Sequence, residues 1–293
     1  MRSFLSFCLV ACLVGAALFW AITRPAELAA RWADPVDADA AAGALVFAAA
    51  GCASCHTPPT AGTEGDAPVL SGGRAFETQF GTFYAPNISP DPVSGIGSWS
   101  FAEFARAVTL GVSPEGSHYY PAFPYTAYNK MEPGDVADLF AFMKRLPVTQ
   151  EPSKQHAVAF PFSQRRALGV WKKLYMSDAY HVTSVPTPEL ERGRYLVEAL
   201  AHCAECHTPR TALGGLDPIR WMEGAPDPAG KGRIPAITPQ VLDWSTADLV
   251  AYFTSGLTPD YDSAGGDMAV VIENLAKLPE ADRMAIAAYL GAL

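Results

Sequence analysis

Cys52-Ala53-Ser54-Cys55-His56 is the stretch that decides the fold, and its pattern returns as Cys203-Ala204-Glu205-Cys206-His207. Two cysteines three positions apart lie close together on one helical turn, where their sulfurs can bond to the two vinyl groups of a haem. The histidine that follows offers an imidazole to the iron. We therefore expect two covalently bound haem c groups, each fixed by three residues: Cys52, Cys55 and His56, and Cys203, Cys206 and His207.

A C-x-x-C pair also occurs in zinc sites and in redox-active dithiols. Zinc would need further cysteine or histidine ligands at matching spacing, but the remaining cysteines, Cys8 and Cys12, lie in an apolar N-terminal run. A redox dithiol does not require the adjacent histidine, and one would not expect it twice. The repeated five-residue pattern therefore favours haem.

Length and composition indicate two small helical domains. The 293 residues leave room for two hydrophobic cores of ordinary size. The 24 glycines and 25 prolines suit helices joined by long ordered loops that wrap a cofactor. The formal net charge of -9 argues against nucleic acid as a partner. We expect an all-α fold.

The N-terminus predicts a membrane anchor. Residues 4–22 carry no charge, and as a helix this run would be about 28 Å long, close to the thickness of a bilayer core. A cleaved signal peptide is the alternative for residues 1–23, and Leu9-Val10-Ala11-Cys12 resembles a lipidation signal, although the apolar run continues past Cys12. We expect residues 24–38 to form a tether.

The haem motifs also predict on which side of the membrane the chain lies. Haem c is attached outside the cytoplasm in bacteria, so the haem-bearing part belongs in the periplasm. We therefore expect a single N-terminal span in the bacterial inner membrane.

The two halves of the chain resemble each other beyond the haem motifs. Residues 86–90 (Pro-Asn-Ile-Ser-Pro) correspond to residues 235–239 (Pro-Ala-Ile-Thr-Pro). A helix containing Gly43 runs into Cys52, and its counterpart containing Gly193 is one residue longer. The repeat predicts an internal duplication with one haem per copy, in domains 39–147 and 189–293 joined by a connector over 148–188.

Both copies carry the same helix boundaries. Ser100 with Glu103, and Ser245 with Asp248, have capping-box spacing at the start of a helix. A glycine then stands where each of these helices would end, at Gly111 and Gly256. Pro133 and Pro279 stand in the expected first turns of the two final helices.

Each iron needs a second axial ligand, and a methionine is available in both copies. Met131 and Met268 fall between the middle and final helix of their copies. A thioether sulfur favours ferrous iron and raises the potential relative to a second imidazole. His118 is the rival at the first site. The other internal methionines are expected to pack in the core, namely Met143, Met176, Met222 and Met284.

The connector places four positive charges in an otherwise acidic chain: Arg165, Arg166, Lys172 and Lys173. They could neutralise haem propionates buried where the domains meet. They could equally form a solvated basic helix face.

Several stretches resemble the cytochrome c subunits of bacterial membrane-bound alcohol and gluconate dehydrogenases, over roughly residues 40–293. They are Asn87–Pro92, Gly95–Ser100 and Tyr120–Tyr125 in the first half, and Cys206–Arg210 and Gly265–Ala269 in the second. The chain is similar to the first two of the three haem domains of those subunits. The resemblance implies tandem class I cytochrome c domains, with Met131 and Met268 as axial ligands.

The resemblance also implies a function, which is to carry electrons from a periplasmic or membrane-bound dehydrogenase towards the respiratory chain. The acceptor would be a soluble cytochrome, a quinone or a terminal oxidase. With two six-coordinate irons the chain would be an electron relay and not an enzyme. The alternative is a dihaem peroxidase, which needs one iron with a vacant or displaceable ligand.

Overall fold

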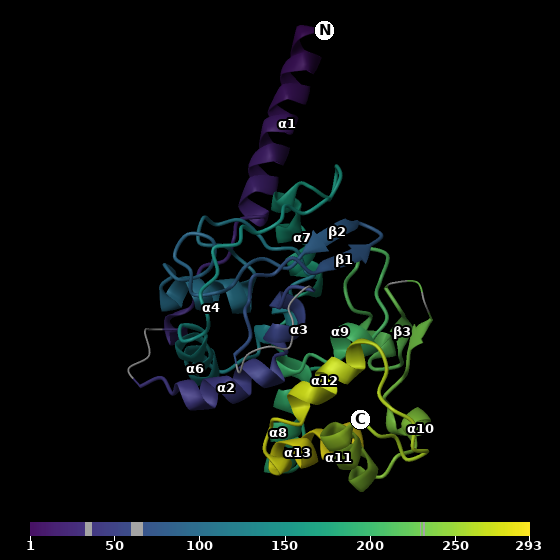
Figure 1. Ribbon diagram of the computed structural model, residues 1–293. Helices are drawn as coiled ribbons and strands as arrows, with labels where there is room; N and C mark the ends of the chain where they lie inside the picture. The colour runs from purple at the N-terminus through teal and green to yellow at the C-terminus, as the bar shows by residue number, and fades with distance from the viewer. Residues whose placement is uncertain (33–36, 60–66, 229, 231) are drawn as a thin grey trace.

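The structure is a computed structural model that describes residues 1–32, 37–59, 67–228, 230 and 232–293. One long helix, α1 (Arg2–Ile22), projects from a globular part that both halves of the chain build (Figure 1). Residues 3–22 are long and apolar enough to cross a membrane, and none of this stretch is buried against the rest of the protein. By contrast, Thr23, which ends the helix, is completely buried.

The first half is built around two crossing helices. Its helices are α2 (Ala40–Ala49), α3 (Cys52–His56), α4 (Phe101–Leu110), α5 (Tyr125–Tyr128) and α6 (Pro133–Met143). Asp39 caps α2 by accepting a hydrogen bond from the Ala41 amide at 2.7 Å. Gly43 lets α2 approach α6 closely, because a β-carbon there would overlap the Asp138 carbonyl.

The second half repeats this arrangement. Its helices are α8 (Pro188–Tyr195), α9 (Ala204–His207), α10 (Pro239–Leu242), α11 (Thr246–Ser255), α12 (Asp267–Leu275) and α13 (Glu280–Leu290). Gly193 in α8 lies against the Ala285 carbonyl of α13, as Gly43 lies against α6. The same close helix crossing thus occurs in both copies, at the glycines that the repeat aligned.

The expected helix boundaries are confirmed except at Pro279. Both capping boxes form, with Ser100 at the start of α4 and Ser245 at the start of α11. Gly111 and Gly256 end these helices in the left-handed conformation, with φ of 59° and 76°. Pro133 is the first residue of α6, whereas Pro279 lies one position before α13.

The extra residue ahead of Cys203 is accommodated as a π-helical turn. The helix α8 runs on into η3 (Leu196–Leu200), which has π-helical hydrogen bonding. A π-turn holds one residue more than an α-helical turn over a similar length. The insertion therefore stays inside the helix, and the haem motif keeps its place relative to α13.

The all-α prediction omits two small antiparallel ribbons. One pairs β1 (Ala75–Thr78) with β2 (Gly81–Tyr84), and the other pairs β3 (Ala225–Pro226) with β4 (Arg233–Ile234). Strands this short carry no long alternating pattern, so they depend on tight turns and on their neighbours. Short turns η1 (Ala30–Trp32), η2 (Arg165–Ala167) and η4 (Pro218–Arg220) complete the structure with α7 (Leu168–Tyr175).

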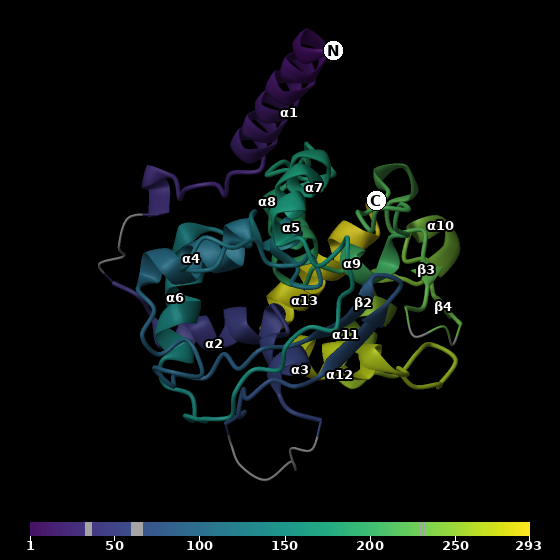
Figure 2. The ribbon, with the colours of Figure 1, turned by 90° about the horizontal axis from the view of Figure 1, so that it is seen from above.

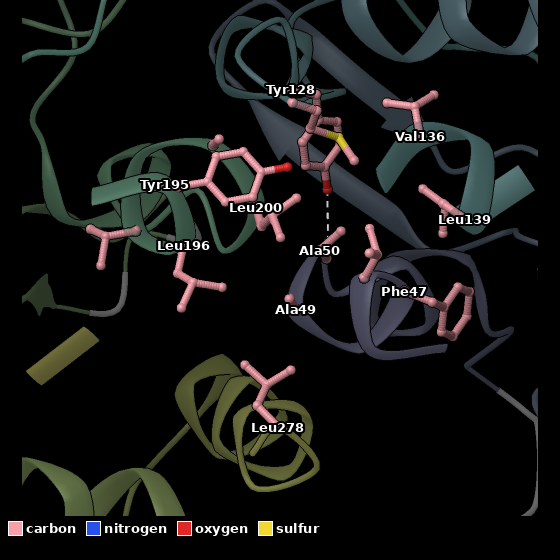
Figure 3. Packing of buried hydrophobic residues seen from close by; sticks show 14 of the residues in the cluster. Phe47, Ala49, Ala50, Tyr128, Val136, Leu139, Tyr195, Leu196, Leu200 and Leu278 are labelled. Atoms are coloured by element: carbon pink, nitrogen blue, oxygen red, sulfur yellow. Dashed lines mark hydrogen bonds between the residues drawn. The ribbon is translucent and has the colours of Figure 1, made fainter. Parts of the chain in front are cut away.

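The two halves share one hydrophobic cluster. Figure 3 shows Phe47 and Ala49 of α2 on one side, with Leu196, Leu200 and Leu278 from the second half facing them. The hydroxyl of Tyr128 donates a hydrogen bond to the Ala50 carbonyl at 2.7 Å inside this cluster. The predicted division into domains 39–147 and 189–293 remains a prediction, because apolar side chains of both halves pack together.

The expected tether is partly packed against the globular part. Of residues 24–38, residues 33–36 lie outside the described part of the chain. Before them, Trp32 is only 4% exposed and Leu28 packs against the hydrophobic cluster. Arg106 donates a hydrogen bond to the Ala26 carbonyl at 3.2 Å. Residues 24–32 therefore hold the chain close to the protein surface.

Candidate haem sites

The first site is the single helical turn α3, which carries Cys52, Cys55 and His56. Gly51, with φ of 63°, turns the chain between α2 and α3. The Nδ1 atom of His56 lies 2.8 Å from the Pro86 carbonyl oxygen. With Nδ1–H donating to that carbonyl, Nε2 is left free to bind a metal, and the ring orientation is fixed.

The second site has the same construction on α9. The Nδ1 atom of His207 lies 2.8 Å from the Pro235 carbonyl oxygen. His202, with φ of 42°, occupies the position that Gly51 occupies in the first copy. Its ring also contacts its own segment, with Nδ1 2.9 Å from the Leu200 carbonyl oxygen. His202 directly precedes Cys203 and bonds within its own segment, so it lies on the proximal side of the second motif.

In each copy a glycine amide bonds to the backbone carbonyl of the proximal histidine, and the sequence predicted neither glycine. The amides of Gly72 and Gly224 donate hydrogen bonds of 2.7 Å to the carbonyls of His56 and His207, respectively. Both glycines have positive φ, at 75° and 78°. The nearest sequence signal was the repeated proline segment. Pro86 and Pro235 begin this segment, and their carbonyls accept the hydrogen bonds of the two histidine rings.

Burial shifts the pKa of the first thiol and of the imidazole in each site towards the uncharged form. It raises the pKa of Cys52 and of Cys203 to about 12. Burial also lowers the pKa of both histidines, against the opposing effect of their backbone hydrogen bonds. A redox-active dithiol needs a lowered thiol pKa, so these pairs have the wrong electrostatics for that role.

The donor set fits haem c and does not fit zinc. Within the described residues, no cluster of three or more histidine, cysteine or acidic side chains could hold a metal ion. The described cysteines form no disulfides, so both sulfurs of each motif are available for thioether bonds. Each motif also presents a neutral, oriented imidazole, which is the proximal ligand that a haem iron requires.

The two methionines expected on the opposite faces lie in different settings. Met131 follows α5, is 2% exposed and belongs to the hydrophobic cluster. Met268 is the second residue of α12 and packs partly buried against the same cluster. The sequence placed Met268 in a loop, whereas it stands in the first turn of a helix that begins one residue earlier. Both remain predicted ligands.

The other histidines have structural partners. His118, the rival ligand, is buried at the end of α1, where its Nε2 atom lies 3.0 Å from the Thr23 carbonyl oxygen. His156 accepts a hydrogen bond from the Tyr84 amide at 3.1 Å. His181 stacks on Trp221 with ring centroids 4.3 Å apart. None of these three contacts involves a residue of either cysteine turn.

Each haem-attachment turn contacts the half of the chain that carries the other haem motif. The Asn274 amide of α12 donates a hydrogen bond of 2.9 Å to the Ser54 hydroxyl, inside the first motif. Arg74 donates to the Ser54 carbonyl and pairs with Asp267, both at 2.6 Å. Both views show α12 beside α3 (Figures 1 and 2).

The second motif has a matching contact. The Thr126 hydroxyl in α5 donates a hydrogen bond of 2.7 Å to the Glu205 carboxylate, which lies inside the second motif. Burial raises the pKa of Glu205, but Arg210 and Thr126 more than offset this effect, so the net pKa is lowered. A buried negative charge therefore lies within the second attachment turn.

Two of the connector cations bond to the ends of helices, Arg166 to the end of α1 and Lys172 to the end of α4. Arg166 donates hydrogen bonds to the Thr23 hydroxyl at 2.8 Å and to the Trp20 carbonyl at 2.6 Å. Lys172 donates to the carbonyls of Leu110 and Gly111 at 2.5 and 2.8 Å. Neither proposed role, propionate neutralisation or a solvated face, describes these two side chains.

Comparison with known proteins identifies the family. Residues 40–147 match the family described as Cytochrome c. The chain is 52% identical over 278 residues to the diheme cytochrome c-type protein of Cereibacter sphaeroides, and the match covers 95% of this chain and 93% of that protein.

Longer relatives are cytochrome subunits. The chain is 39% identical over 255 residues to the fructose dehydrogenase cytochrome subunit of Gluconobacter japonicus, which covers 83% of this chain and 50% of that protein. It is 33% identical over 265 residues to the gluconate 2-dehydrogenase cytochrome c subunit of Pantoea cypripedii, and that match covers 86% of this chain and 58% of the subunit. The chain thus spans about half the length of these two subunits.

These matches agree with a duplicated C-x-x-C-H motif whose thiols, imidazoles and supporting carbonyls are alike in both copies. The chain belongs to the dihaem c-type cytochromes, proteins of electron transfer, and it carries two covalently bound haem c groups.

Proposed function

We propose that this protein is a membrane-anchored dihaem cytochrome c that relays single electrons from a dehydrogenase towards the respiratory chain. The observation that carries this proposal is the direct contact between the two haem-attachment turns and the opposite halves of the chain. Ser54 of the first motif bonds to Asn274, and Glu205 of the second bonds to Thr126. Each motif thus contacts the half of the chain that carries the other motif, an arrangement that suits passage of an electron between the two haems.

His56 with Met131, and His207 with Met268, are the proposed axial pairs. The hydrogen bonds from His56 and His207 to proline carbonyls support the proximal assignment, because they orient each Nε2 towards a ligand. The burial of Met131 supports its assignment, since a thioether ligand has to be shielded from water. Haem c supplies the reversible one-electron chemistry, while the chain sets its potential through these ligands.

The end of α1 supports retention of the helix as an anchor. Thr23 fills a site made by His118, Arg166 and Gly169, and a β-carbon at Gly169 would clash with the Thr23 backbone. Removal of Thr23 with a signal peptide would leave buried polar groups without partners, which is unfavourable. In this proposal the anchor is a single span, with the haem sites on the periplasmic side of the bacterial inner membrane because haem c is attached there.

The donor is a periplasmic or membrane-bound dehydrogenase, by analogy with the relatives, whose names assign them to fructose and gluconate dehydrogenases. The acceptor is a soluble cytochrome, a quinone or a terminal oxidase. Isolated membranes that contain the protein should reduce both haems when the donor's substrate is added. Membranes from cells that lack the chain should consume less oxygen with that substrate.

A redox titration of the purified full-length protein tests the relay. We expect two low-spin haems, a lower potential for one haem in Met131→Ala and for the other in Met268→Ala, and unchanged potentials in Met143→Ala, a control that removes a buried methionine from α6. High-spin haem in the resting protein together with peroxide turnover would contradict the relay and favour the peroxidase. The relatives favour the relay, because they are cytochrome subunits.

A further inference from the structure

The junction between α1 and the globular part holds a segment of the connector level with the last turn of α1. The hydropathic stretch ends at Ile22, so the last turn of α1 is where a bilayer surface would lie. Trp20 in that turn is 65% exposed, as suits a side chain of the aromatic belt at a membrane surface. Arg166 lies over the Trp20 ring, 3.9 Å from its centroid, and donates to the Trp20 carbonyl. The connector around Arg166 is therefore held at the same depth.

Apolar side chains of this connector segment are turned to the outside. Phe160 is 79% exposed and Phe162 is 48% exposed, and both precede η2. Val170 and Leu174 share one face of α7 and are 38% and 63% exposed. In Figure 1 the loop ahead of α7 rises beside the base of α1, beyond the rest of the globular part.

The charge of this segment is opposite to that of the protein as a whole. Residues 160–175 contain four cations and no acidic residue, in a chain of net charge -9. Lys172 turns inward to backbone carbonyls, whereas Lys173 is exposed and Arg165 lies over the Tyr120 ring. Exposed aromatic and aliphatic side chains next to cations are the composition of segments that bind at the headgroup level of an anionic membrane.

We propose that residues 160–174 form a second membrane contact, which inserts its apolar side chains among the headgroups and acyl-chain ends and binds anionic phospholipid. The contact is continuous with the end of α1, so the inference rests on the proposed membrane anchor. Together, helix and connector give the protein two points of attachment. The haem-bearing part is thereby held in one orientation on the membrane.

Spin labels on the full-length haem-loaded protein in lipid nanodiscs test this contact. In a background with Cys8→Ala and Cys12→Ala, single labels are placed at Phe160→Cys, at Val93→Cys and at Val10→Cys. Val93 is 91% exposed in the first half and serves as the water reference, and Val10 in α1 serves as the bilayer reference. Collision with a water-soluble nickel chelate and with oxygen, which partitions into lipid, reports the depth of each label.

In nanodiscs that contain phosphatidylglycerol, we expect nickel collision at position 160 to be several-fold lower than at 93, and oxygen collision to be higher. A label at 160 as accessible to nickel as that at 93, with the label at 10 in lipid, would overturn the second contact and leave the anchor intact. A water-exposed label at 10 would overturn the anchor, and the second contact with it.

The lipid preference has its own control. Lys173→Gln in the labelled protein should increase nickel collision at position 160 in the anionic nanodiscs, as should replacement of phosphatidylglycerol by phosphatidylcholine. Arg233→Gln removes the same charge from exposed β4 and should change nothing. If neither Lys173→Gln nor the lipid exchange changes the collision rate, the anionic preference is wrong.

Discussion

Single residues outside the haem motifs hold each proximal histidine in place. The ring of His207 bonds to the Pro235 carbonyl, and its own carbonyl accepts a hydrogen bond from Gly224. The corresponding groups in the first copy are Pro86 and Gly72. Ring orientation is therefore set by the polypeptide, at positions well beyond the five residues of the motif.

Gly224→Ala should destabilise the protein. At φ of 78° an alanine is strained, and its β-carbon would lie 2.7 Å from the Ile234 carbonyl oxygen. We expect a loss of about 1–3 kcal/mol in the free energy of unfolding by denaturant. Gly265→Ala is the matched control, because within the described residues a β-carbon there meets no atom closer than 4 Å. Equal stability of the two variants would contradict this explanation.

The sequence predicts the residues that attach haem better than those that support them. The two cysteines and the histidine of each motif lie on one helical turn, so their spacing in the sequence is enough to indicate haem attachment. Pro86 lies 30 positions from His56, and the contact uses its carbonyl, which every residue has. The repeated proline segment marked the region, but no side-chain property identified the acceptor.

At the level of elements, helix starts and ends are the most predictable feature. Ser245 illustrates this, since its side chain accepts from the Asp248 amide while the Asp248 carboxylate accepts from the Ser245 amide. The two residues are local in sequence, so no tertiary contact is needed to form the cap. The π-turn at Leu196–Leu200 was visible only as an extra residue, because α8 and α13 decide where it is absorbed.

Ser245→Ala should weaken α11 at its start. We expect a loss of about 1 kcal/mol in the free energy of unfolding, measured by denaturant titration, because the Asp248 amide in the first turn loses the hydroxyl that accepts its hydrogen bond. Thr254→Ala removes a hydroxyl that donates only to a carbonyl of the same helix, so it should leave stability almost unchanged. A loss in Thr254→Ala as large as that in Ser245→Ala would argue against the cap.

Lys172 in α7 should make stability depend on pH. Burial, with a smaller contribution from Arg106, lowers the pKa of Lys172 from 10.5 to about 7. Above that value the unfolded chain binds one proton more than the folded chain, so the free energy of unfolding should rise with pH between about 7 and 10. The slope should stay below about 1.4 kcal/mol per pH unit, because water still reaches Lys172.

Denaturant titrations at about pH 7 and 8.5 check this slope. Lys172→Met should reduce the rise in the free energy of unfolding, since no proton is then taken up at that position on unfolding. Lys173→Gln changes the adjacent exposed lysine and should keep the rise. The same slope in Lys172→Met as in the unmodified protein would show that another group causes it.

At the scale of the whole molecule, the two copies depend on each other. Duplication was readable from the repeated motifs, but the packing between copies was not. Asn274 and Thr126 each donate a hydrogen bond to the haem motif of the other half, so neither bond can form within a single copy. The shared cluster and these crossed hydrogen bonds arise only when the two halves meet, so a pattern within one half cannot reveal them.

Glu205→Gln should raise the potential of one haem. The substitution removes a buried negative charge inside the second attachment turn, and that charge favours the oxidised, more positive iron. We expect an increase on the order of tens of millivolts in a redox titration. Glu223→Gln, which neutralises an exposed glutamate in the same half, should leave both potentials close to those of the unmodified protein. An unchanged potential in Glu205→Gln would contradict an electrostatic role.

The bond between Ser54 and Asn274 also has a consequence for biosynthesis. The two residues are 220 positions apart, so during synthesis the first thiol pair emerges long before the helix that bonds to its turn. Until residue 274 has been made, the first attachment turn lacks its contact with α12. The second motif differs, because its partner Thr126 precedes it in the chain and has already been made when Cys203 emerges.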